Sequence, residues 1–128
     1  MSYNVLIVDD SSIVRKVLIK CFGITDIPVS NFIQAGNGQE ALEELDKNWI
    51  DVIFLDINMP IMNGLEFLDA LRANKEHKHL PVVVVSTEGS AERRDHMERA
   101  GISAYLRKPV SPEQLIEIME KVFGGIKK

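Results

Sequence analysis

Short apolar runs recur along the chain, and the segment between each pair is long enough for a helix. The runs are rich in β-branched residues, which favour strands, and they are Val5–Val8, Val29–Ile33, Val52–Leu55, Val82–Val85 and a weaker Ile102–Leu106. The fourth run is continuously hydrophobic, as is typical of a strand buried on both faces of a parallel sheet. Strands that alternate with helices predict one α/β domain of three layers.

The segments between the runs carry apolar residues at helical spacing. In the first segment Ser11 or Ser12 is the expected cap, and Gly23 is expected to end the helix. The apolar residues of this segment fall at i, i+3, i+4 and i+7, which predicts an inward stripe of Val14, Val17, Leu18 and Cys21. Similar stripes in the second and third segments are Ala41, Leu42 and Leu45, and Leu65, Leu68 and Leu71.

The last two helical segments differ in how clearly the sequence marks them. In the final helix Ser111 is the predicted cap, Pro112 occupies the first turn, Gln114 completes an S-x-x-Q capping box, and Gly124 ends the helix. Segment 90–100 is much more polar, because its only apolar residues for a core are Ala91, Met97 and Ala100. We therefore expect this segment to be loosely held and movable.

Composition narrows the range of functions. A chain of 128 residues, 45% hydrophobic and 27% charged, is typical of one globular domain. No apolar run approaches the roughly 18 residues of a membrane span, and the N-terminus lacks a signal-peptide pattern. The net charge of −4, without a large Lys/Arg cluster, disfavours nucleic acid as a partner. The single cysteine, Cys21, cannot form an intramolecular disulfide, so a cytoplasmic location without membrane contact is expected.

Polar side chains follow four of the five predicted strands. Ligands of open α/β sheets bind outside the carboxyl ends of the strands, so these side chains are predicted to share one edge of the sheet. They are Asp9 and Asp10 after the first strand, Asp56 after the third, Ser86 and Thr87 after the fourth, and Lys108 after the fifth. Any one of them taken singly is most simply a solvated loop residue. Because such residues follow four of the five strands, however, we predict a ligand-binding site at this edge of the sheet.

These residue types suit phosphoryl transfer. Three carboxylates with one ammonium group leave a negative site, which favours Mg²⁺ because this ion prefers carboxylate oxygens and often joins a phosphate. An aspartate can also be the nucleophile that accepts a phosphoryl group. The transfer needs positive charge and hydrogen-bond donors around the phosphoryl oxygens. Asp10, Asp56, Ser86 and Lys108 meet these needs, and the residues predict phosphorylation of one aspartate.

The whole chain resembles the receiver domain of bacterial two-component response regulators, in its stand-alone, CheY-like form. The resemblance is carried by VLIVDDS, AGNGQEAL, DVIFLDINMPIMNG, PVVVVST and GISAYLRKP, and most specifically by D-x-x-M-P-x-x-x-G from Asp56 to Gly64. It implies a flavodoxin-like (βα)5 fold, a doubly wound five-stranded parallel sheet of order 2-1-3-4-5 with helices on both faces. We expect a single receiver domain over residues 1–128 without an attached output domain.

The resemblance also implies roles at the acidic end of the sheet. Asp56 is the expected phosphoacceptor, and Lys108 is expected to pair with the phosphoryl group. The expected Mg²⁺ ligands are Asp9, Asp10, Asp56 and the backbone carbonyl of Asn58. Asp10 is the expected direct ligand, whereas Asp9 acts either directly or through water. The bond between Lys108 and Pro109 is expected to be cis.

Further residues match the switch and its control. The switch hydroxyl is either Ser86 or Thr87, and its position in the run favours Ser86. Tyr105 matches the aromatic residue that turns inward when the hydroxyl moves. Asn58 and Glu88 match positions that tune dephosphorylation, and this pair is similar to that of chemotaxis regulators, which lose their phosphoryl group quickly.

These roles imply a signalling switch that catalyses only its own phosphoryl transfer and autodephosphorylation. The expected phosphodonor is a histidine kinase, and the expected output is a changed surface over segments 90–100, 102–106 and 112–124. That surface is expected to signal to a downstream protein, for example a flagellar motor switch protein in chemotaxis. The alternative is a phosphorelay intermediate or adaptor that passes its phosphoryl group to a histidine phosphotransfer protein.

Other classes of protein fit the sequence less well. An aspartate-nucleophile phosphatase is a distant alternative, because its acid/base aspartate two positions after the nucleophile is here Asn58, which cannot transfer a proton. A flavodoxin-like cofactor carrier would place a phosphate beside Asp9 and Asp10, which would repel it. His77 and His79 suggest a metal site, but without further ligands a solvated loop is the simpler interpretation.

Overall fold

The computed structural model describes residues 2–87 and 90–124. In this part of the chain five parallel strands form one sheet in the order β2-β1-β3-β4-β5. The strands are β1 (Tyr3–Val8), β2 (Val29–Ala35), β3 (Val52–Leu55), β4 (Val82–Ser86) and β5 (Ala104–Arg107). The predicted fold class and strand order are therefore confirmed, although β5 begins two residues later than its apolar run.

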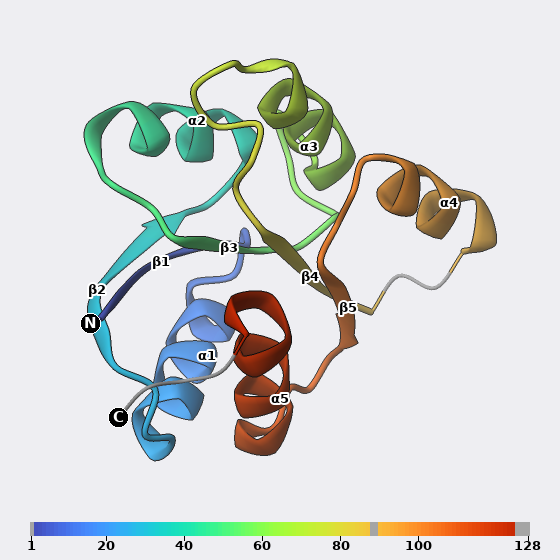
Figure 1. The fold of residues 1–128 in the computed structure, drawn as a ribbon. Coiled ribbons are helices and arrows are strands. Elements are labelled where there is room, and N and C mark those ends of the chain that lie inside the picture. Colours follow the sequence, from blue (N-terminus) through green and yellow to red (C-terminus); the bar gives the residue numbers. More distant parts are fainter. Residues whose placement is uncertain (1, 88–89, 125–128) are drawn as a thin grey trace.

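The helices cover both faces of the sheet. They are α1 (Ser12–Ile24), α2 (Gly38–Lys47), α3 (Gly64–Ala73), α4 (Ala91–Arg99) and α5 (Pro112–Phe123). Helices α1 and α5 lie on one face, and α2, α3 and α4 lie on the other (Figure 1). Within the described residues no helix is both long and apolar enough to cross a membrane.

The central strands are buried on both faces, which explains their continuous hydrophobicity. Because successive side chains of a strand point to opposite faces, Leu6 and Val8 join the core beneath α2 and α3, whereas Val5 and Ile7 join the core beneath α1 and α5. In β4 all residues from Val82 to Ser86 are buried. The sheet thus holds the ends of β1, β3 and β4 in fixed positions.

Helix α1 departs from its prediction in two respects. Ser11 caps it by accepting a hydrogen bond from the Val14 N–H, but the helix continues through Gly23. It ends where the Thr25 N–H and hydroxyl both donate to the carbonyl of Phe22. The predicted inward stripe is also partly wrong, because Val17 is 54% exposed and the buried residues of the helix are Leu18 and Phe22.

Helix α5 confirms its prediction closely. Ser111 and Gln114 form a complete capping box, Pro112 is in the first turn, and Gly124 ends the helix in the left-handed conformation at φ 72°. A residue with a Cβ rarely adopts this conformation, so glycine suits the position. Leu115 and Met119 are fully buried in the core. The bond between Lys108 and Pro109, just before this helix, is cis as predicted.

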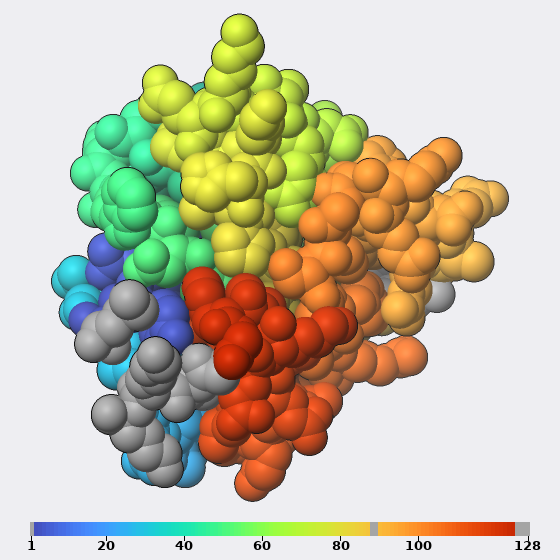
Figure 2. Space-filling view, in the orientation of Figure 1, coloured from blue at the N-terminus to red at the C-terminus, as the bar shows by residue number. Residues whose placement is uncertain are grey.

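Helix α4 is attached to the domain by fewer buried side chains than α5, and its C-terminal end is held by hydrogen bonds. Its only buried residue is Met97, which packs into the core beneath α2 and α3. Its C-terminal end is fixed by Arg72, whose guanidinium donates hydrogen bonds to the carbonyls of Ala100 (2.7 Å) and Gly101 (3.0 Å) and to Lys78 and Leu80. In the space-filling view α4, in orange, lies at the edge of the visible face, whereas α5, in red, lies within it (Figure 2).

Candidate functional site

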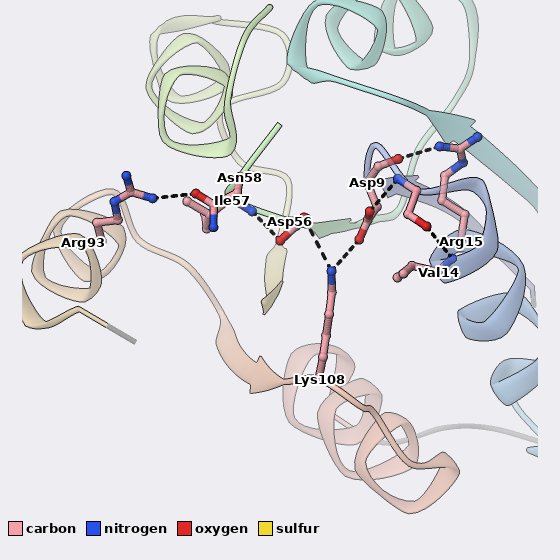
Figure 3. A network of polar contacts seen from close by, with 9 residues as sticks. Asp9, Val14, Arg15, Asp56, Ile57, Asn58, Arg93 and Lys108 are labelled. Carbon is pink, nitrogen blue, oxygen red and sulfur yellow. Dashed lines mark hydrogen bonds and ion pairs between the residues drawn. The ribbon is translucent and has the colours of Figure 1, made fainter. Parts of the chain in front are cut away.

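The predicted polar residues do meet at the carboxyl ends of the strands. Asp9 follows β1, Asp56 follows β3, and Lys108 follows β5 and reaches back between the two carboxylates (Figure 3). The backbone fixes both acidic residues, because the Asp9 N–H donates to Ala35 and the Asp56 N–H donates to Val8. The site is thus built on rigid strand ends.

Lys108 bridges two buried carboxylates. Its Nζ lies 2.8 Å from Oδ2 of Asp9 and 3.5 Å from Oδ2 of Asp56. The side chains of Asp9 and Asp56 are 6% and 9% exposed, so water screens these ion pairs only weakly. One ammonium group is shared by two carboxylates, which leaves the site negatively charged.

Asp10 adds a third carboxylate. One oxygen from each of Asp9, Asp10 and Asp56 lies within 4.8 Å of the others. Asp10 is exposed, whereas the other two are buried. Three carboxylates this close repel one another, and a hard divalent cation would relieve the repulsion. The cluster therefore fits a cation bound through oxygen ligands.

The chemistry of Asp56 is set by its surroundings. Burial raises the pKa of its carboxyl above the ordinary value, and the charge of Asp9 adds to this rise. The ammonium of Lys108, the Ile57 N–H and the Ser86 hydroxyl act in the opposite direction but do not cancel it. The Ile57 N–H donates to Oδ1 of Asp56 at 2.9 Å. One carboxylate oxygen is thus held by the backbone, and the other faces Lys108.

Lys108 keeps its charge in this environment. Burial alone would lower the pKa of its ammonium group, but the hydrogen bond to Asp9 and the charge of Asp56 raise that pKa above its ordinary value. A fixed positive charge beside a buried carboxylate is suited to stabilise further negative charge brought to that carboxylate.

The two hydroxyls at the end of β4 have different positions. Ser86 is fully buried, and its side chain lies close enough to the carboxyl of Asp56 to lower the pKa of that carboxyl. Thr87 is exposed and lines a cavity of about 380 Å³ that also reaches Asp56 and Lys108. The exposed Val17 of α1 lines the same cavity, which explains why the stripe of α1 is not fully buried.

The glycine of the D-x-x-M-P-x-x-x-G motif has a packing role. A Cβ added to Gly64 would lie 2.7 Å from the Cα of Ile57, closer than real Cβ contacts. The Gly64 N–H also donates to the carbonyl of Ile57 at 2.8 Å. The first turn of α3 therefore packs directly against the backbone that carries Asp56.

Comparison with known proteins identifies this arrangement. A model of the response regulator receiver domain matches residues 5–120. The chain belongs to this family.

Individual relatives match the receiver domain over nearly its whole length. It is 36% identical to a chemotaxis protein CheY homolog of Campylobacter jejuni over 122 residues, which cover 94% of this chain and 92% of that protein. It is 35% identical to the chemotaxis protein CheY of Pseudomonas aeruginosa, with 96% and 98% covered. The crystal structure of Vibrio cholerae chemotaxis protein CheY4 superposes with a TM-score of 0.83 at 33% identity, over 95% of this chain and 99% of that one.

The receiver domain also contains two arginine contacts that the sequence did not reveal. Nη1 of Arg93 in α4 donates to Oδ1 of Asn58 at 2.8 Å (Figure 3). The guanidinium of Arg94 lies over the ring of Tyr105, 4.4 Å from its centroid. The charge-rich sequence of α4 was the only signal for these residues, and it does not specify their partners. The predicted tuning residue Glu88 lies outside the described residues.

Proposed function

We propose that this receiver domain is a phosphorylation-dependent switch and that Asp56 accepts the phosphoryl group. The observation that carries the proposal is the position of Lys108, whose Nζ lies 3.5 Å from Oδ2 of Asp56 and 2.8 Å from Asp9. A buried carboxylate with one oxygen held by the backbone and a cation beside the other is oriented for nucleophilic attack.

The phosphodonor that fits this chemistry is a phosphohistidine on a partner kinase. An oxygen of Asp56 attacks phosphorus, a P–O bond forms, and the P–N bond to the imidazole breaks with its electron pair leaving on nitrogen. Asp9, Asp10, Asp56 and the backbone carbonyl of Asn58 would hold Mg²⁺, which supplies positive charge at the transferring oxygens. Lys108 stabilises a further oxygen by charge, and the Ser86 hydroxyl stabilises another by hydrogen bonding.

Phosphorylation then changes the contacts of Ser86. In the unphosphorylated protein its hydroxyl lies near the carboxyl of Asp56 and lowers the pKa of that carboxyl. The added phosphoryl oxygens draw this hydroxyl toward them, and the partly buried Tyr105 turns into the space it leaves. Because Tyr105 lies against Arg94, its movement alters the surface formed by α4, β5 and α5. A partner protein binds this surface when its shape has changed.

The relatives suggest what that partner does. Proteins named for chemotaxis match this chain at 35–36% identity over nearly their full length. We therefore propose that the receiver domain acts in chemotaxis and that its target is a flagellar motor switch protein. Its own catalysis is limited to accepting and losing the phosphoryl group, since Asn58 cannot supply the acid/base group of a phosphatase.

Direct labelling tests the acceptor. The protein is incubated with acetyl phosphate and Mg²⁺, and intact mass spectrometry measures the gain of one phosphoryl group. We expect labelling of the wild type and of the control variant Asp95→Asn, which loses an exposed carboxylate of α4. Asp56→Asn is expected to show no label, and chelation of Mg²⁺ should abolish labelling of the wild type. Persistent labelling of Asp56→Asn would disprove the assignment.

A second assay separates the two outputs. The phosphorylated protein is mixed with a flagellar motor switch protein and, separately, with a histidine phosphotransfer protein. Binding of the switch protein that depends on phosphorylation supports the proposed output. Transfer of the label to the histidine of the second protein, without switch binding, would instead establish a phosphorelay role.

A further inference from the structure

The side chain of Arg93 connects α4 to the loop that carries the acceptor. Its Nη1 donates to Oδ1 of Asn58 at 2.8 Å, although the two residues are 35 positions apart in the sequence. Asn58 lies two residues after Asp56, and Arg93 lies in the first turn of α4, where its N–H is capped by Ser90. In Figure 3 the guanidinium of Arg93 meets Asn58 from the side opposite to Lys108.

This contact fixes the orientation of the Asn58 carboxamide. A hydrogen bond from a charged donor is stronger than one between neutral groups, so the carbonyl oxygen of Asn58 is held toward α4. A water molecule that hydrolyses a phosphoryl group on Asp56 must approach phosphorus in line with the bond that breaks. An amide oxygen that is directed toward α4 and already accepts one hydrogen bond from Arg93 is less well placed to accept another from that water.

We propose that Arg93 is a positioning residue that prolongs the phosphorylated state by holding Asn58 toward α4. This inference rests on the proposed function, because it concerns hydrolysis of the phosphoryl group on Asp56. Arg93 lies outside the group of residues that meet at Asp56, and its proposed effect on hydrolysis runs through its hydrogen bond to Asn58.

The same contact couples the site to α4. Within the described residues α4 buries only Met97, so the polar contacts of its first turn contribute a large share of what positions that end. Coupling between two sites is reciprocal. A partner that binds α4 and draws Arg93 away from Asn58 would therefore shorten the life of the phosphorylated state.

The test measures how long the label persists. Each protein is phosphorylated with acetyl phosphate and Mg²⁺, the donor is removed, and loss of the label is followed by intact mass. Loss of one charge-assisted hydrogen bond predicts that Arg93→Ala shortens the half-life about threefold to tenfold. Arg93→Lys keeps a cationic donor and is expected to retain at least half of the wild-type half-life. The control Arg99→Ala removes an exposed arginine at the other end of α4 and should leave the half-life unchanged.

A double-mutant cycle separates this role from a structural one. In an Asn58→Ala background the Arg93→Ala substitution is expected to change the half-life less than about 1.5-fold, because the partner through which Arg93 acts is gone. An equal effect in both backgrounds, or an unchanged or longer half-life of Arg93→Ala, would overturn the inference. Failure of the proposed function looks different, because the wild type itself would then take up no label.

Discussion

Helices α4 and α5 flank the same strand, β5, yet they are held in place by different forces. Helix α5 begins with a capping box at Ser111, ends at a left-handed Gly124 and buries Leu115 and Met119 completely. Helix α4 buries one residue, Met97, and its other described side-chain contacts are hydrogen bonds and the contact of Arg94 with the ring of Tyr105. Its side chains bond to Asn58 and Asp69, and its C-terminal carbonyls bond to Arg72.

The difference determines which of the two helices can move. Removing buried apolar side chains from a core exposes surface to water and costs about 25 cal/mol per Å². A polar contact at the surface exchanges with hydrogen bonds to water at a much smaller net cost. Helix α4 is thus suited to shift when the site changes, whereas α5 is suited to provide a fixed frame.

The largest expected change in the free energy of unfolding comes from truncating the buried side chain that anchors each helix in its core. Leu115→Ala should lower the free energy of unfolding by about 3 kcal/mol, as is usual for a fully buried leucine. Met97→Ala should lower it by only about half as much, because α4 can detach and relax without unfolding the sheet. Urea denaturation measures both values. Hydrogen exchange should show that Met97→Ala loses protection mainly in α4. If the two variants lowered the free energy of unfolding equally, the proposed difference between α4 and α5 would be wrong.

A smaller effect is expected at the acidic site. The pKa of Asp56 is raised in the folded state, so its ionisation opposes folding as the pH rises through that pKa. Asp56→Asn should therefore raise the free energy of unfolding by about 1 kcal/mol at pH 7, since it removes one of three clustered charges.

The pH dependence checks the cause of this stabilisation. The gain should disappear below the ordinary carboxyl pKa of about 4, where Asp56 is protonated in both states. Urea unfolding at several pH values measures it. The stabilisation should be global, so that the difference in protection between α4 and α5 persists; a gain confined to α4 would contradict our interpretation.

Capping provides a third comparison, because the side chains of Ser111 and Ser90 each accept a hydrogen bond from a backbone N–H in the first turn of α5 and α4, and only Ser111 belongs to a complete capping box. Ser111→Ala should cost about 1 kcal/mol of global stability, as loss of a cap usually does. Ser90→Ala should change the global value by less than about 0.5 kcal/mol but still reduce protection of the first turn of α4. Thermal unfolding and hydrogen exchange distinguish the two outcomes.

The smallest effect is expected from the contact between α3 and α4. Nε2 of His96 lies 2.9 Å from Oδ1 of Asp69, and the two side chains are 37% and 58% exposed. A single polar contact between partly exposed side chains contributes about 0.2–1 kcal/mol, so Asp69→Asn should lower protection of α4 by a few-fold without changing that of α5. Glu117→Gln on the exposed side of α5 is the matched control. An effect as large as that of Met97→Ala would mean that polar contacts, rather than Met97, anchor α4.

Much of the fold follows from local sequence. The five apolar runs became the five strands, and Ser111, Pro112, Gln114 and Gly124 marked α5 correctly, because these signals depend on hydrogen bonds and burial within one element. Gly23 was misinterpreted as a helix end. Glycine permits an end without requiring it, and here the cap is Thr25.

The candidate site was predictable where parallel topology decides proximity. Asp9, Asp56 and Lys108 meet because the ends of β1, β3 and β5 lie at one edge. The contacts of Arg93 and Arg94 were not predictable. Long side chains have several rotamers, and their partners depend on the distance between α4 and the sheet. Hydrophobic periodicity in the sequence does not predict that distance.

Arg72 fixes one end of α4 and leaves the other end free of this restraint. Its guanidinium donates hydrogen bonds to the carbonyls of Ala100 and Gly101, so the C-terminal end of α4 is the fixed end about which the helix can tilt. A helix of nine residues is about 13 Å long. A tilt of about 10° around the C-terminal end would therefore displace the N-terminal end of α4 by about 2 Å. Under the proposed function, a displacement beside Asp56 would therefore move the first turn of α4 farther than its last turn.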